Sequence, residues 1–169
     1  DASFGARITG VDLRNVTGDS FEELYNIWLD YALLVFPGQF LTNQEQITIA
    51  KRFGELEFEL AALSNVLSDG SVRADDDSDD VIKVLKGNMG WHHDSTYMPV
   101  QAKGAIFTAE VVPDEGGATG FADMRAGYDA LDRKTKDRIE DLKAHHSLYH
   151  SQAKVGHAGK AGSHKDEWD

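Results

Sequence analysis

Two different patterns of apolar and polar residues predict strands in the first third of the chain. Residues 6–13 alternate apolar and polar positions, which is typical of a half-buried strand. Residues 32–36 are continuously apolar and are followed by Pro37 and Gly38, which end the run. Such a short apolar run predicts a strand that is buried on both faces.

Helical spacing replaces alternation between and after these two segments. Ser20 and Glu23 have the spacing of a capping box and predict a helix start. Thr42 and Glu45 predict a second helix in the same way, with Gly54 as its C-terminal cap. Apolar side chains recur on one face of each expected helix and are expected to lie in the core. They are Phe21, Leu24, Tyr25, Trp28, Leu29, Ile47, Ala50 and Phe53.

The remaining chain mixes further strands with helices. The pattern predicts strands at residues 60–66, 81–85, 91–97, 102–112 and 144–151, and helices at 124–131 and 133–142. We find no internal repeat and no linker, and 169 residues is the size of one domain. The sequence therefore predicts a single α+β domain over residues 1–169 in which strands carry the chemistry.

Residues 69–80 are polar and strongly acidic. A calcium-binding loop needs alternating ligands, a central glycine and a terminal glutamate, and this segment lacks that pattern. A solvated loop is the better interpretation.

Composition narrows the function classes. The chain has no cysteine, which excludes disulfides, thiolate zinc sites and a thiol nucleophile and fits a reducing, cytoplasmic location. No apolar run reaches membrane-spanning length. The net charge of −12 argues against nucleic acid or an anionic membrane as partner. The sequence opens without Met, so a removed targeting segment stays possible.

His92 and Asp94 form a His-x-Asp pattern between aromatic residues. On a strand, both side chains point to one face and His93 points to the other. An imidazole nitrogen and a carboxylate oxygen on one face can bind the same metal ion, as in non-heme Fe(II) oxygenases. A local His–Asp hydrogen bond on a surface strand is the alternative. The pattern itself is weak, because the polar tail repeats it at His164 and Asp166.

Several sequence blocks together resemble the taurine dioxygenase / 2,4-dichlorophenoxyacetate dioxygenase (TauD/TfdA) family of Fe(II)- and 2-oxoglutarate-dependent enzymes. They are GARITGVDL at 5–13, LVFPGQ at 34–39, AKRFG at 50–54, WHHDSTY at 91–97, GGAT at 116–119 and FADMRAGYDAL at 121–131. Each block is short, but they occur in order and at the family's spacing. Residues 98–100 and 121–131 are most similar to the aryloxyalkanoate (phenoxy-herbicide) branch.

The resemblance implies a fold and a role for each matched residue. The implied fold is a double-stranded β-helix, the jelly-roll, with flanking helices, here incomplete. His92 and Asp94 match the first two iron ligands, and Thr119 matches the threonine that hydrogen-bonds 2-oxoglutarate. Asn88 and Tyr97 match residues of the substrate pocket. Ala118 replaces the acidic residue that family members usually have before the threonine.

The family's third iron ligand and its 2-oxoglutarate-binding arginine lie further along than this sequence reaches. We therefore expect the chain to be the N-terminal portion of the domain, with no assignment for its other histidines. The resemblance implies Fe(II), 2-oxoglutarate and O₂ as cofactor and co-substrates, and hydroxylation of a small organic acid with release of succinate and CO₂. On an aryloxyalkanoate, this reaction would cleave the ether.

Other interpretations stay open. The substrate is a small carboxylate or a sulfonate, as in a taurine-type dioxygenase, and the protein can form a homo-oligomer. A non-catalytic jelly-roll fragment and a zinc hydrolase are the alternatives from other classes, since zinc also accepts His and Asp ligands.

Overall fold

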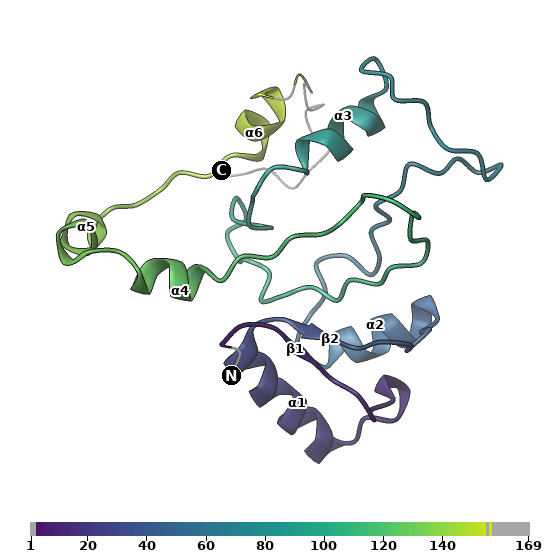
Figure 1. Cartoon of the computed structure of the whole chain (residues 1–169), viewed down its shortest axis with the longest axis horizontal. Coiled ribbons are helices and arrows are strands. Elements are labelled where there is room, and N and C mark those ends of the chain that lie inside the picture. The colour runs from purple at the N-terminus through teal and green to yellow at the C-terminus, as the bar shows by residue number, and fades with distance from the viewer. Residues whose placement is uncertain (1–2, 155, 157–169) are drawn as a thin grey trace. The chain divides into compact units, whose positions relative to one another are not determined.

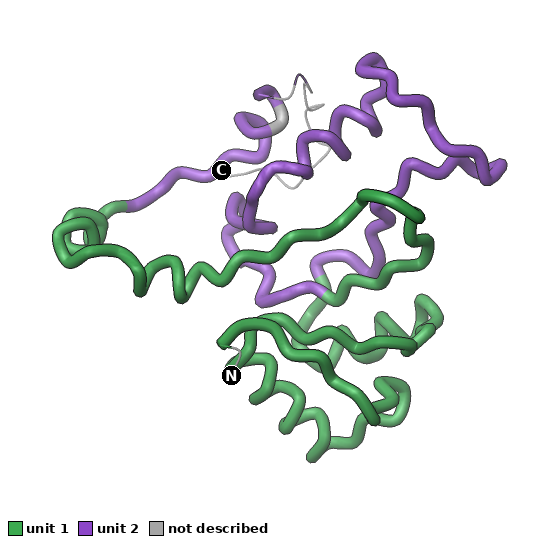
Figure 2. The backbone as a smooth tube through the Cα atoms, in the orientation of Figure 1, with its two compact units in different colours: residues 1–56, 106–142 green, residues 57–105, 143–169 purple. Residues whose placement is uncertain are grey.

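A computed structural model describes residues 3–154 and residue 156 (Figure 1). The elements in chain order are β1 (Ala6–Arg7), the 3-10 helix η1 (Leu13–Asn15), α1 (Gly18–Tyr31), β2 (Leu34–Val35), α2 (Asn43–Lys51), α3 (Asp80–Gly87), α4 (Met124–Asp129), α5 (Arg133–Ile139) and α6 (Leu148–Lys154). Figure 2 shows two compact units: residues 1–56 with 106–142 form the first, and residues 57–105 with 143–169 form the second. Within the described ranges, no helix has both the length and the apolar character needed to span a membrane.

The two predicted strands at the start of the chain pair with each other in parallel. Ala6 lies opposite Leu34, and Arg7 lies opposite Val35. A parallel pair needs a crossover between its strands, and α1 lies in that connection (Figure 1). The strands are shorter than expected. The prediction that the second is buried on both faces is wrong, because the side chain of Val35 is 50% exposed.

The helix α1 begins three residues earlier than its sequence pattern indicated. Thr17 is the N-cap, and it forms a reciprocal capping box with Ser20 in place of the expected box between Ser20 and Glu23. The predicted apolar stripe is confirmed except at Leu29, which is 54% exposed and does not lie in the core. The rings of the stripe pack edge-on or tilted around Phe53, with centroid distances of 4.8 Å from Phe21 and 5.4 Å from Trp28.

The predicted start of α2 is confirmed. Thr42 is the N-cap and Glu45 completes the capping box. The helix ends at Lys51 with Arg52 as its C-cap, so the prediction of Gly54 as the cap is wrong. The buried apolar side chains of the first unit are Leu24, Ile47 and Ile49.

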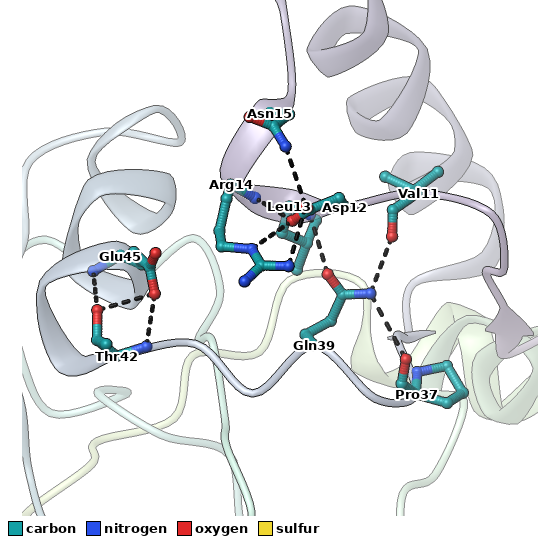
Figure 3. Close-up of polar contacts among 9 residues, drawn as sticks. All are labelled: Val11, Asp12, Leu13, Arg14, Asn15, Pro37, Gln39, Thr42 and Glu45. Carbon is teal, nitrogen blue, oxygen red and sulfur yellow. Dashed lines mark hydrogen bonds and ion pairs between the residues drawn. The ribbon is translucent and has the colours of Figure 1, made fainter.

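The side chain of Gln39, in the segment after β2, forms hydrogen bonds with the chain at the start of η1 (Figure 3). Its Oε1 accepts a hydrogen bond from the Leu13 amide at 2.9 Å, and its Nε2 donates to the Val11 carbonyl at 2.9 Å. A longer bond of 3.5 Å reaches the Pro37 carbonyl. The side-chain amide of Gln39 therefore pairs with a backbone amide and a backbone carbonyl, as a neighbouring strand would.

Two side chains join distant segments of the first unit. Gln46 of α2 donates to the Ile106 carbonyl at 3.3 Å and accepts from the Thr108 hydroxyl at 2.7 Å. The Arg125 guanidinium of α4 donates to the carbonyls of Leu29 and Asp30, at the end of α1. The predicted strand at 102–112 is wrong, because these residues have no ladder partner and are held at 106–108 by the Gln46 side chain.

In the second unit, the predicted strand at 81–85 is instead the helix α3. Asp79 caps it by accepting hydrogen bonds from the amides of Val81 and Ile82, and Ile82 is buried. Arg73 forms an ion pair with Asp79 at 2.7 Å. The hydrogen bond from the Val81 amide, followed by the Arg73 contact, lowers the pKa of Asp79.

The acidic segment lies in a solvated loop up to Asp79, as predicted, and it is tied to α3. Lys86 forms ion pairs with Asp75 and Asp77 at 2.5 and 2.6 Å. These two carboxylates raise the pKa of the Lys86 ammonium.

Three other predicted strands are also wrong for the described residues. The segment 60–66 contributes only an isolated bridge between Val66 and Val72. Residues 91–97 form no strand and run into a turn, and α6 occupies the second half of 144–151. The helices predicted at 124–131 and 133–142 are confirmed as the shorter α4 and α5. The described chain is therefore mainly helix and loop rather than mainly β, because these extended segments have no neighbouring strand among its residues.

Candidate functional site

His92 and Asp94 face each other at the start of a loop that follows α3. The His92 Nε2 lies 3.2 Å from the Asp94 Oδ1, and the two side chains are 50% and 75% exposed. Residues 94–97 form a turn rather than the predicted strand. Ser95 has a positive φ of 57°, and the Met98 amide donates to the Ser95 carbonyl at 3.0 Å.

The partner of the other ring nitrogen, Nδ1, determines which nitrogen of His92 carries the hydrogen. Its Nδ1 lies 2.7 Å from the Gly90 carbonyl, which can only accept a hydrogen bond, so Nδ1 must carry the hydrogen. In the neutral imidazole, Nε2 then directs a lone pair at the Asp94 oxygen. Two lone pairs at 3.2 Å repel each other unless a cation, either a proton on Nε2 or a metal ion, compensates them.

The donor set suits a metal ion. Two ligands at about 2.1 Å from an ion, at right angles to each other, are about 3 Å apart, close to the observed 3.2 Å. A backbone carbonyl that holds the second ring nitrogen is also the usual environment of a metal-binding histidine. The pair supplies two ligands, and residues 3–154 contain no group of three or more potential ligands placed to hold an ion.

His93 is oriented differently from His92. Its Nδ1 lies 2.8 Å from the carbonyl oxygen of Asp94, so its ring contacts the backbone of the loop rather than the Asp94 carboxylate. The second His-x-Asp pattern, at His164 and Asp166, lies outside the described residues.

The other candidate residues fall in both units. Asn88 is the exposed C-cap of α3, and Tyr97 is half-buried in the loop after Asp94. Both belong to the same unit as the His92–Asp94 pair. Thr119 belongs to the first unit and is exposed, two residues after Gly117.

One residue near the pair carries no signal in the sequence. The carboxylate of Glu57 accepts a hydrogen bond from the Ser95 hydroxyl at 2.9 Å, across 38 positions. Glu57 lies in a stretch that alternates glutamate with an apolar residue from 55 to 60, and nothing in this alternation singles it out from Glu55 and Glu59.

Comparison with known proteins identifies the family of the chain. A family model described as "Taurine catabolism dioxygenase TauD, TfdA family" matches residues 1–167. The chain is 63% identical over 161 residues to the (S)-phenoxypropionate/alpha-ketoglutarate-dioxygenase of Sphingobium herbicidovorans, covering 95% of this chain and 56% of the relative. It is 36% identical over 169 residues to the alpha-ketoglutarate-dependent 2,4-dichlorophenoxyacetate dioxygenase of Cupriavidus pinatubonensis, covering 90% of this chain and 58% of the relative.

A solved structure has a similar fold. The crystal structure of AAD-2 in complex with Mn(II) and N-oxalylglycine matches with a TM-score of 0.85 and 38% identity, over 95% of this chain and 59% of that one. The chain thus spans less than two thirds of the proteins it matches. The two relatives are named as alpha-ketoglutarate-dependent dioxygenases. The chain belongs to the TauD/TfdA family.

Proposed function

We propose that the full-length natural protein is an Fe(II)- and 2-oxoglutarate-dependent dioxygenase that acts on an aryloxyalkanoate. The facing donors of His92 and Asp94, with the His92 Nδ1 hydrogen committed to a carbonyl, carry the proposal. Family membership supports it, as do the relatives named for phenoxypropionate and 2,4-dichlorophenoxyacetate. The Mn(II) and N-oxalylglycine bound by AAD-2, a metal and a 2-oxoglutarate analogue, support the choice of cofactor and co-substrate.

Each candidate residue has a role in this proposal. His92 and Asp94 hold the iron from one side, and Asp94 also offsets part of its charge. The Thr119 hydroxyl donates a hydrogen bond to the distal carboxylate of 2-oxoglutarate. Asn88 and Tyr97 line the substrate pocket, with the Asn88 amide as a polar contact and the Tyr97 ring as an apolar wall.

The iron centre, when bound with 2-oxoglutarate and O₂, supplies the oxidising equivalents for hydroxylating a C–H bond, with release of succinate and CO₂. Hydroxylation at the carbon beside the ether oxygen of an aryloxyalkanoate gives a hemiacetal or hemiketal. This product collapses to a phenol and an oxo acid.

We also propose that these residues form part of one jelly-roll domain in a cytoplasmic protein. The similarity to AAD-2 supports the domain, and the lack of cysteine is compatible with a reducing compartment. Far-UV circular dichroism of the natural protein should show a strong β contribution, and a purely helical spectrum would contradict a jelly-roll core.

Anaerobic titration with Fe(II) and 2-oxoglutarate tests the proposed centre. The natural protein should develop the visible charge-transfer band of a chelate complex, and Asp94→Ala should not. With O₂ and a phenoxyalkanoate, the natural protein should release a phenol and succinate in equal amounts, and the variant should release neither.

His93→Ala is the matched control, because it removes an imidazole from the same loop whose ring does not face the Asp94 carboxylate. It should retain the band. Turnover of Asp94→Ala at the natural rate would refute the assignment of the pair. Activity on a sulfonate but not on a phenoxyalkanoate would refute the substrate class alone.

A further inference from the structure

The loop that carries the proposed metal ligands contains an unfavourable backbone conformation next to one of them. Ser95 directly follows Asp94 and has a φ of 57°, in the left-handed region that residues with a Cβ seldom occupy. The conformation must therefore be held in place by contacts of the loop. The bond from the Met98 amide to the Ser95 carbonyl closes the turn on one side.

Glu57 supplies a second contact, from outside the loop. Its Oε2 accepts the Ser95 hydroxyl at 2.9 Å, and a hydrogen bond to an ionised carboxylate is stronger than one between neutral groups. Both residues belong to the second unit, so the contact lies within one compact body. The bond fixes the position of the Ser95 side chain relative to a segment 38 residues earlier.

Ser95 bears on Asp94 because the two residues share a peptide group. A contact that fixes Ser95 therefore limits how far the backbone of Asp94 can move. The Asp94 carboxylate lies 3.2 Å from the His92 Nε2, so its position depends on how firmly this part of the loop is held.

We propose that Glu57 is a positioning residue for this turn. By accepting the Ser95 hydroxyl, it anchors the chain directly after Asp94 and so limits the motion of the Asp94 carboxylate beside His92, where the pair can share a cation. The inference rests on the proposed function of the pair as metal ligands. Glu57 acts through Ser95 and is not itself a ligand.

Metal affinity tests the proposal without any need for turnover. The natural full-length protein, freed of metal, is titrated with Mn(II), and the free ion is followed by electron paramagnetic resonance. Glu57→Ala should weaken Mn(II) binding about tenfold, the lower end of the effect of removing residues that orient metal ligands. Glu57→Gln should bind within about threefold of the natural protein, because its side-chain carbonyl still accepts the Ser95 hydroxyl.

Ser95 offers a second pair of variants. Ser95→Ala removes the hydroxyl but keeps the Cβ, and should weaken binding as much as Glu57→Ala. Ser95→Gly removes the hydroxyl but adopts a positive φ freely, and should retain more affinity than Ser95→Ala. Because Glu57 and Ser95 act through one bond, the double variant Glu57→Ala/Ser95→Ala should bind no more weakly than either single variant.

Glu55→Ala is the matched control, since it removes an exposed carboxylate two positions earlier. It should leave Mn(II) affinity unchanged, which separates positioning from a general loss of negative charge. Thermal unfolding of every variant shows which of them are folded, and Glu57→Gln and Ser95→Gly keep the test decisive if an alanine variant unfolds.

The outcomes separate the two proposals. A natural protein that binds no Mn(II) would overturn the proposed function and this inference with it. Natural affinity in Glu57→Ala would overturn the inference alone. Equal loss in Glu57→Gln and Glu57→Ala would also overturn it, because the carboxylate charge and not the hydrogen bond would then matter.

Discussion

Replacing Gln39 by glutamate changes one nitrogen to oxygen and replaces a hydrogen bond of the first unit by a contact between two acceptors. In the structure, the Gln39 side chain accepts from the Leu13 amide and donates to the Val11 carbonyl, both at 2.9 Å (Figure 3). An ionised glutamate can still accept from Leu13. It cannot donate to Val11, and its second oxygen would lie against that carbonyl.

The cost follows from these contacts. A half-buried hydrogen bond contributes about 1 kcal/mol net, so Gln39→Ala, which loses both short bonds but admits water, should lower the free energy of unfolding by about 1–2 kcal/mol. Gln39→Glu loses only one bond but places a charge against a carbonyl oxygen, and it should cost about 2–3 kcal/mol. The conservative change is therefore expected to be the more damaging one.

Urea unfolding of the natural protein and both variants at pH 7 measures this order. Hydrogen exchange at the Leu13 amide gives a local readout: exchange should be faster in Gln39→Ala than in Gln39→Glu, which keeps that acceptor. At about pH 4 the introduced carboxyl becomes protonated and can donate to Val11, so the deficit of Gln39→Glu should shrink. Unfolding free energies of Gln39→Glu and the natural protein within about 0.5 kcal/mol of each other at pH 7 would refute this reasoning.

Three further predictions concern caps and a turn. Thr42→Ala should destabilise α2 by about 1 kcal/mol in urea unfolding, whereas Thr42→Ser should be nearly neutral. Equal losses would show that the hydroxyl is not what stabilises the helix start. The Asp79 carboxylate has a pKa held below its ordinary 3.8 by the amide at the start of α3 and by Arg73. The contribution of this carboxylate to the stability of α3 is full above pH 3.8. It is lost as the pH falls through the lower pKa of the folded protein. Helicity of α3 should therefore fall more on acidification in the natural protein than in Asp79→Asn, as followed by amide exchange, and parallel profiles would contradict this. Gly117→Ala should weaken 2-oxoglutarate binding in a calorimetric titration, because the turn at 117 precedes Thr119. Residue 117 has a φ of 65°, and a Cβ there would lie 2.9 Å from the Pro113 Cγ. Unchanged affinity would show that this turn does not position the Thr119 hydroxyl.

Elements specified by nearby residues were predictable from the sequence, and those that depend on distant partners were not. The helix α2 has its cap and its apolar face within a dozen residues, so both were recognisable. The apolar run at 81–85 is short enough to fit either a strand or a helix. The residue that decides between them is Asp79, which caps α3 but was interpreted only as part of the acidic loop.

For the candidate site, the identity of the pair was predictable and its geometry was not. The spacing of His92 and Asp94 pointed to side chains on one side of the chain, and the structure does bring them together. The turn that follows the pair depends on the conformation of Ser95, which no sequence rule assigns to a serine in this context. The contact with Glu57 depends on the path of the intervening chain, which local patterns do not describe.

The first unit is assembled from two stretches that are separated in sequence by residues 57–105. Gln46 with Thr108, and Arg125 with Leu29, connect these stretches without using the chain between them. A protease that cuts the exposed acidic segment would therefore not separate the halves. They would stay together under native conditions and run as two fragments only after denaturation, so cleavage there would go unnoticed in size-exclusion chromatography.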